Sequence, residues 1–193
     1  MRTVLAIALV LLIALIGSAG LVYFGSYNVA ATDSHWGLTQ QILDTVKTRS
    51  IKAHASGITV PADLDNPDRL VIGVEHFAAH CAVCHGGPGV PKGDIGKGLY
   101  PTPPDLAVSA HRYTAAELFW IIKNGIKMTG MPAWSDHSDE EIWSTVAFLQ
   151  KLGDGMTEQQ YGELIRQTMM QGGMHHHDTA APKGGSAGPG HSH

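Results

Sequence analysis

The only two cysteines of this chain stand in the pattern Cys81-Ala82-Val83-Cys84-His85. Two thiols about one helical turn apart can form thioethers with the two vinyl groups on one edge of a porphyrin. The histidine that follows then lies beneath the ring, where an imidazole nitrogen can bind the iron. The spacing therefore predicts one covalently attached haem c, with His85 as an axial ligand.

Other interpretations of the cysteine pair fit the sequence less well. A disulfide redox pair of the thioredoxin type belongs in a βαβ context, which the sequence does not show. A structural zinc site needs a second pair of ligands at matching spacing, and no further cysteine exists. The nearby His76 and His80 precede the motif and are expected to be surface or packing residues.

An apolar segment at the N-terminus predicts a membrane anchor. Residues 3–32 carry no charge, and Val4 to Phe24 is almost wholly apolar. About 20 such residues cross a bilayer as a helix, whereas a cleavable signal usually has a shorter apolar core. A signal cleaved after Val29-Ala30-Ala31 and a buried core helix are the alternatives. Because Arg2 is the only nearby cationic side chain, we expect residues 1–25 to be an uncleaved anchor with a cytoplasmic N-terminus and the rest exported.

A spacer is expected over residues 26–65. It contains a predicted amphipathic helix that begins near Ser34, with Trp36 suited to a membrane interface. One apolar stripe at helical spacing favours a packing helix or a stalk; its residues are Leu38, Ile42, Leu43 and Val46.

Residues 66–153 carry start signals for three helices. Asn66 before Pro67 opens a helix that leads into the cysteine motif. Two capping boxes open the others, and glycines end them; the pairs are Thr114 with Glu117, and Ser138 with Glu141, and the stops are Gly125 and Gly153. Because no segment shows sustained period-two alternation, we predict an all-α domain.

Two further segments follow this domain. A short helix is expected over residues 154–171, and a disordered His/Gly-rich tail over residues 172–193. The tail and the residues before it gather imidazole and thioether groups that suit copper; they are His175, His176, His177, His191, His193, Met169, Met170 and Met174. A copper-linked periplasmic function is therefore one alternative, and an incidentally sticky tail is the other.

A second axial ligand is expected on the far face of the haem. Met131 is preferred, because Gly130 and Pro132 on either side suit an irregular loop that holds a side chain over a flat ring. Met128 is the reserve, and either methionine can instead simply fill the core.

Residues 66–153 resemble a class I (mitochondrial-type) monohaem cytochrome c, of the bacterial membrane-anchored kind. Four features carry the resemblance: a glycine and an aromatic ahead of the motif, the motif itself, a proline-rich segment, and a methionine loop followed by a closing helix. They are Gly73 and Phe77, Cys81 to His85, Tyr100 to Leu106, and Gly130-Met131-Pro132 with Trp143 and Phe148.

The resemblance implies three main helices around one covalent haem. It also implies a protein that transfers single electrons and catalyses no bond chemistry, since both axial positions are filled. Pocket-lining and propionate-binding candidates are Leu99, Leu106, Arg112, Pro132 and Trp134. Lys92 and Lys97 are candidates for steering a partner, with a plainly solvated role as the alternative.

The predicted function is therefore that of a membrane-tethered electron carrier between respiratory or dehydrogenase partners. It would be a single-pass protein of a bacterial inner membrane, with the haem domain in the periplasm. The alternative is a haem subunit of a membrane-bound dehydrogenase or oxidase complex. A formal net charge of −4 and a charged fraction of 16% argue against binding to nucleic acid.

Overall fold

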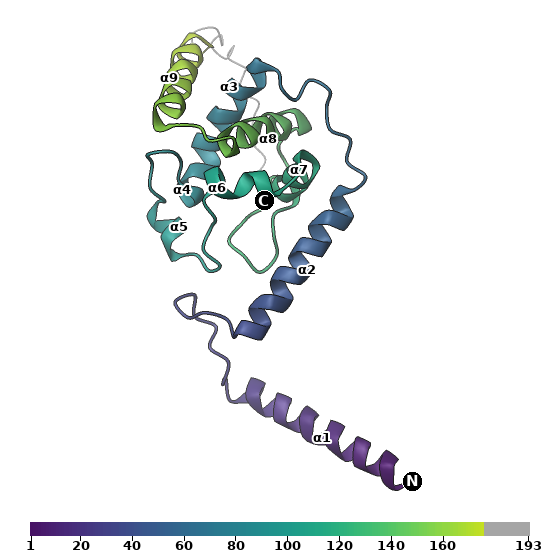
Figure 1. The fold of residues 1–193 in the computed structure, drawn as a ribbon. Coiled ribbons are helices and arrows are strands. Elements are labelled where there is room, and N and C mark those ends of the chain that lie inside the picture. Colours follow the sequence, from purple (N-terminus) through teal and green to yellow (C-terminus); the bar gives the residue numbers. More distant parts are fainter. Residues whose placement is uncertain (176–193) are drawn as a thin grey trace, which may run out of the picture.

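A computed structural model describes residues 1–175 of the chain, and Figure 1 shows their arrangement. Within this range there is no β-strand, only an isolated bridge between Gly87 and Val90. The predicted all-α class is confirmed. Most of the predicted His/Gly-rich tail, residues 176–193, lies outside the described residues, and with it four of the eight candidate copper ligands.

The described residues contain helices joined by loops. In chain order they are α1 (Arg2–Tyr23), α2 (Gly37–Ala55), α3 (Pro67–His76), the π-helix η1 (Phe77–Cys81), α4 (Ala82–His85), α5 (Asp94–Gly98), α6 (Leu106–Ser109), the 3-10 helix η2 (Ala110–Arg112), α7 (Ala115–Asn124), α8 (Asp139–Gly153) and α9 (Glu158–His175).

The predicted helix starts within the domain are confirmed by their caps. The Asn66 side chain accepts a hydrogen bond from the backbone of Asp68, and Pro67 occupies the first turn of α3. Both capping boxes have their two reciprocal hydrogen bonds, at Thr114 for α7 and at Ser138 for α8. Each cap satisfies backbone N–H groups that the first helical turn leaves unpaired.

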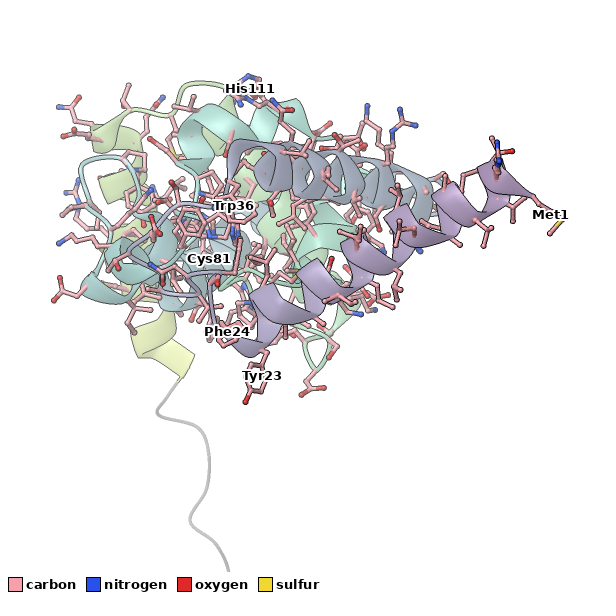
Figure 2. All side chains as sticks on the ribbon, turned by 90° about the horizontal axis from the view of Figure 1, so that it is seen from below. Met1, Tyr23, Phe24, Trp36, Cys81 and His111 are labelled. Atoms are coloured by element: carbon pink, nitrogen blue, oxygen red, sulfur yellow. The ribbon has the colours of Figure 1, made fainter. Side chains whose placement is uncertain are left out.

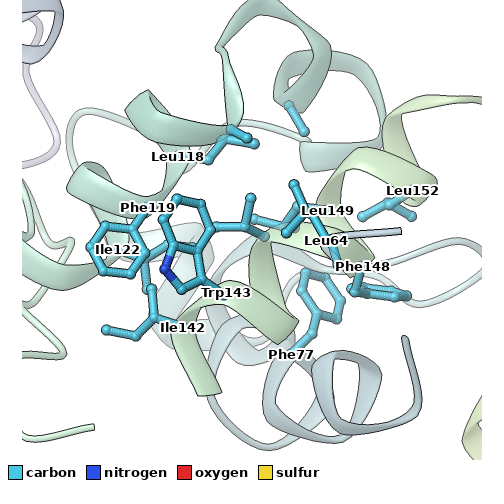
Figure 3. Close-up of a cluster of buried hydrophobic side chains, with 14 of the residues drawn as sticks. Leu64, Phe77, Leu118, Phe119, Ile122, Ile142, Trp143, Phe148, Leu149 and Leu152 are labelled. Carbon is cyan, nitrogen blue, oxygen red and sulfur yellow. The ribbon is translucent and has the colours of Figure 1, made fainter. Parts of the chain in front are cut away.

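The core is centred on the crossing of α3 and α8 (Figure 3). The two helices touch at Gly73, where a Cβ atom would lie only 2.0 Å from the Ser144 carbonyl oxygen. This close approach brings Phe77 against Phe148, with ring centroids 5.0 Å apart. The crossing fixes the direction in which the chain enters the cysteine motif.

Helix α9 belongs to the same core. Tyr161 is buried and its ring lies 6.2 Å from that of Phe77, so α9 packs beside α3. The helix continues to His175, past the predicted boundary at 171. The sequence predicted a short polar helix here, and the structure shows it closing one side of the domain.

Helix α2 packs against α7 through its C-terminal half. Ile51 and Ala55 are buried in this contact, whereas Leu38, Ile42 and Val46 of the predicted stripe are exposed. The spacer also reaches the domain through Tyr100: the His35 backbone N–H donates to the Tyr100 hydroxyl (3.0 Å), which donates to Gln40 Oε1 (2.9 Å).

Helix α1 stands apart from the other elements, and its side chains project on all sides between Met1 and Tyr23 (Figures 1 and 2). It contains no buried residue, and its mean hydropathy reaches 2.8. Among the described residues it is the one helix whose length and composition suffice to cross a membrane. Its bounds agree with the predicted anchor.

Candidate functional site

The cysteine motif lies where α3 changes its winding. Helix α3 passes into the π-helix η1 at Phe77, and η1 ends at Cys81; Cys84 and His85 follow in α4. Short π-helical turns within α-helices occur often at functional sites. Here the turn brings Cys81 against the core while Cys84 and His85 stand at its edge.

The two cysteines are not joined by a disulfide, and both are half-buried. Burial, followed by the neighbouring Cys84, raises the pKa of the Cys81 thiol to about 12. Thiol–disulfide exchange and zinc ligation both need a thiolate, so the environment of Cys81 does not favour either. A half-buried pair at the rim of an apolar core suits attachment to the edge of an apolar ring.

His85 is oriented by the proline-rich segment. Its Nδ1 lies 2.8 Å from the Pro104 carbonyl oxygen, and because a carbonyl can only accept, Nδ1 carries the proton. The lone pair is then on Nε2. The pKa of His85 is lowered, chiefly by burial, with Lys92 adding to the effect. The imidazole is therefore neutral, fixed in one tautomer and free to bind iron through Nε2.

The proline-rich segment spans the distance from the motif to the methionine loop. At one end, Pro104 holds His85. Leu99, which directly precedes the segment, lies against the loop that carries Met131, since a Cβ atom on Gly130 would lie 2.5 Å from Leu99 Cδ2. The segment thus joins the two sides between which a ring would be held.

The two candidate methionines differ in exposure and in backbone support. Met131 is half-buried; its N–H donates to Thr129 Oγ1 (3.1 Å), and its carbonyl accepts from the Ile126 N–H (3.2 Å). Met128 is 72% exposed and has a backbone φ of 60° at the tip of the same loop. The loop therefore holds Met131 in place and directs Met128 to solvent.

The remaining predicted pocket residues fall into two groups. Leu99, Leu106 and Trp134 are half-buried, whereas Pro132 and Arg112 are exposed. Arg112 lines a cavity beside α2, together with Thr48, Lys52, Glu117 and others. Arg112 therefore lies beside the spacer helix α2.

The two lysines considered for partner steering both have partners within the domain. Lys92 Nζ donates to the Pro103 carbonyl, and Lys97 pairs with Asp94 at 3.3 Å. Lys92 thus supports the segment that orients His85.

A histidine cluster lies beside the motif, and the sequence did not predict it. The rings of His76, His80 and His137 pack on one another and on Trp134, with His80 and Trp134 4.8 Å apart between centroids. Burial, then His80 and His137, lowers the pKa of His76 to about 4. The four-residue spacing of His76 and His80 could have signalled one shared helix face, but nothing local relates them to His137.

Comparisons with known proteins bear on part of the chain. Residues 69–149 match the family model described as cytochrome C oxidase, cbb3-type, subunit III. The matched span begins in α3, includes the cysteine motif, Pro104 and Met131, and ends within α8. No curated protein matches the chain.

Proposed function

Residues 69–149 form a class I c-type cytochrome domain with one covalently bound haem c, and on that premise we propose that the chain is a membrane-tethered carrier of single electrons between respiratory or dehydrogenase partners. The observation that carries the proposal is the hydrogen bond from His85 Nδ1 to the Pro104 carbonyl. It leaves Nε2 as the only nitrogen of that ring able to bind a metal, in a residue that stands four positions after the first of two cysteines that form no disulfide.

The chain's own residues have distinct parts in this function. Cys81 and Cys84 would attach the ring, His85 would bind one face of the iron, and Met131 the other. The bound haem supplies a one-electron iron couple. Pro104 and Lys92 hold the proximal side, and the hydrogen bonds around Thr129 hold the distal loop. With both axial positions filled by protein, no substrate reaches the iron, which favours electron transfer over catalysis.

Met131 is the ligand through which the protein would set the potential. A thioether ligand raises the haem potential relative to a second imidazole. Its half-buried position and the two backbone hydrogen bonds of its loop support Met131 over the exposed Met128.

Replacing each methionine tests the ligand assignment. In Met131→His, we expect the haem to stay six-coordinate and its midpoint potential to fall, because imidazole replaces thioether. Met128→Leu is the matched control and should keep the potential of the unmodified protein. Redox titration followed by absorption spectroscopy measures both. An unchanged spectrum in the Met131 variant, or a changed one in the Met128 variant, would contradict the assignment.

We also propose that α1 anchors the chain in the inner membrane of a bacterium, with the haem domain on the periplasmic side. Helix α1 buries no residue, and its one charged side chain, Arg2, stands at its N-terminal end, which supports this orientation. A tether raises the effective concentration of the carrier near membrane-bound partners.

The second candidate function is that of a haem subunit in a larger complex. It is favoured by the description of the matching family, which names a subunit of an oxidase. Extraction in mild detergent followed by native sizing distinguishes the two: a free carrier migrates near its own mass plus detergent, whereas a subunit migrates with its complex.

A further inference from the structure

Three imidazoles from separate parts of the chain converge beside the cysteine motif. His76 ends α3, His80 lies in η1, and His137 lies in the loop just before α8. One ring nitrogen from each histidine lies within 4.8 Å of the corresponding nitrogens of the other two. His76 is buried, while His80 and His137 are half-buried, so the cluster is supported from beneath and reached from one side.

A buried hydroxyl fixes the tautomer of His76. The Thr145 Oγ1 hydrogen is donated to the Glu141 carbonyl (2.9 Å). The same oxygen lies 3.0 Å from His76 Nδ1 and must accept there, because its one hydrogen is already used. His76 therefore carries its proton on Nδ1, and its Nε2 lone pair faces His137 Nδ1 at 3.1 Å.

We propose that His76, His80 and His137 form a binding site for a divalent transition-metal ion of the kind that prefers imidazole, such as Zn²⁺. Two nitrogens bound to a tetrahedral zinc at about 2.0–2.1 Å are roughly 3.3 Å apart, which is close to the separation seen between His76 and His137. The third nitrogen, on the half-buried His80 ring, lies within 4.8 Å of the other two. Water can occupy the fourth position on the open side.

The surroundings match those of histidine-ligated metals. Such ligands usually give their second ring N–H to an acceptor that fixes their orientation, as Thr145 does for His76. The Glu141 carboxylate lies 4.0 Å from His137 Nδ1 and supplies negative charge near a bound cation. Trp134 packs on all three rings and limits their movement.

The site would join two parts of the domain that hold the ring. His80 directly precedes Cys81, and His137 follows the loop that carries Met131 and Trp134. A metal ion bound by both would link the haem-attachment segment to the distal loop. None of the three histidines is assigned to the haem, so this inference does not depend on the proposed electron carrier.

Zinc titration of the full-length holoprotein in detergent tests the proposal. Because other histidines bind metals, all proteins carry Asn at the tail positions 175, 176, 177, 191 and 193. After treatment with EDTA and removal of the chelator, calorimetry with Zn²⁺ should show one site per chain. His137→Ala and His80→Ala should each weaken zinc binding by more than about 100-fold. This exceeds the effect of removing a residue that only hydrogen-bonds to a metal ligand.

The control is His111→Ala, which removes an exposed histidine outside the cluster and should bind zinc as the tail-substituted protein does. Haem absorption and the thermal midpoint verify that each variant is folded. The midpoint should also rise with Zn²⁺ in the tail-substituted protein and not in His137→Ala, since a ligand that binds only the folded state stabilises it. Absence of a site, or an affinity in either the His80→Ala or the His137→Ala variant equal to that of the tail-substituted protein, would overturn the proposal.

Thr145 serves as a test of positioning. Thr145→Val keeps the shape of the side chain but removes the acceptor for His76 Nδ1, and should weaken zinc binding 10- to 100-fold. Thr145→Ser restores the hydroxyl and should restore the affinity. If the Val and Ser variants bind zinc equally, the hydroxyl does not position His76 for a metal.

Discussion

The single proton on His85 Nδ1 shows how much of this site is decided by one backbone carbonyl. Pro104 cannot donate through its nitrogen, and its carbonyl accepts from the imidazole at 2.8 Å. The sequence alone relates Cys81, Cys84 and His85 to one another, because their predicted chemistry depends only on local spacing. The contact with Pro104 joins residues 19 positions apart and could not be derived from spacing.

His76 gives a prediction on acid stability in the metal-free protein. Its pKa is about 4 in the folded chain against the usual 6.5, so the unfolded chain takes up the proton first as the pH falls. This contribution to stability is complete above pH 6.5 and is lost progressively as the pH falls from 6.5 to about 4.

With EDTA present, His76→Gln should therefore lose less thermal stability than the unmodified protein between pH 7.5 and pH 4.5. Differential scanning calorimetry at the two pH values measures the difference. His111→Gln, at an exposed position, should retain the full acid sensitivity. Equal losses in His76→Gln and the unmodified protein would show that His76 does not titrate as described.

At the scale of elements, the contact of α3 with α8 depends on Gly73. A Cβ atom there would lie 2.0 Å from the Ser144 carbonyl oxygen and 2.8 Å from Phe148 Cβ. The first of these is backbone and cannot rotate away, so the helices must separate. We expect Gly73→Ala to lower the free energy of unfolding by at least about 1–3 kcal/mol, the usual effect of overpacking.

Chemical denaturation of the holoprotein, followed by circular dichroism, measures that loss. Gly162→Ala in α9 is the matched control, since its Cβ would meet no atom within 4 Å. It should be neutral or stabilising by up to about 1 kcal/mol, because alanine favours the helix. Similar destabilisation by both substitutions would contradict the close contact as its cause.

The helices that begin with a strong cap were the ones predictable from sequence. The starts of α7 and α8 follow from Thr114 and Ser138, whose partners lie three residues away. The burial of Tyr161 in α9 and of Ile51 in α2 depends on contacts with distant elements, which local patterns do not reveal. The π-turn before Cys81 likewise has no distinct local signature.

For the whole molecule, attachment to the membrane should reside in α1 alone. Replacing residues 1–25 with a cleavable export signal should release the protein into the soluble periplasmic fraction with its haem spectrum intact, because no α1 side chain is buried against the domain. Cell fractionation with haem staining measures this. The unmodified chain is the control and should stay with the membrane; a variant that also stays there would place the attachment elsewhere.

The packing of α2 against α7 limits the orientations in which the proposed carrier can present its haem to a partner. Helix α2 has 19 residues and is about 28 Å long. It is held against the domain at both ends, by the buried Ile51 and Ala55 near its C-terminus and by the hydrogen bond from the Tyr100 hydroxyl to Gln40 near its N-terminus. A carrier attached through a flexible linker would present its haem edge in every direction. Because α2 has a fixed orientation relative to the domain, a redox partner of the proposed carrier would have to approach the haem edge from one direction.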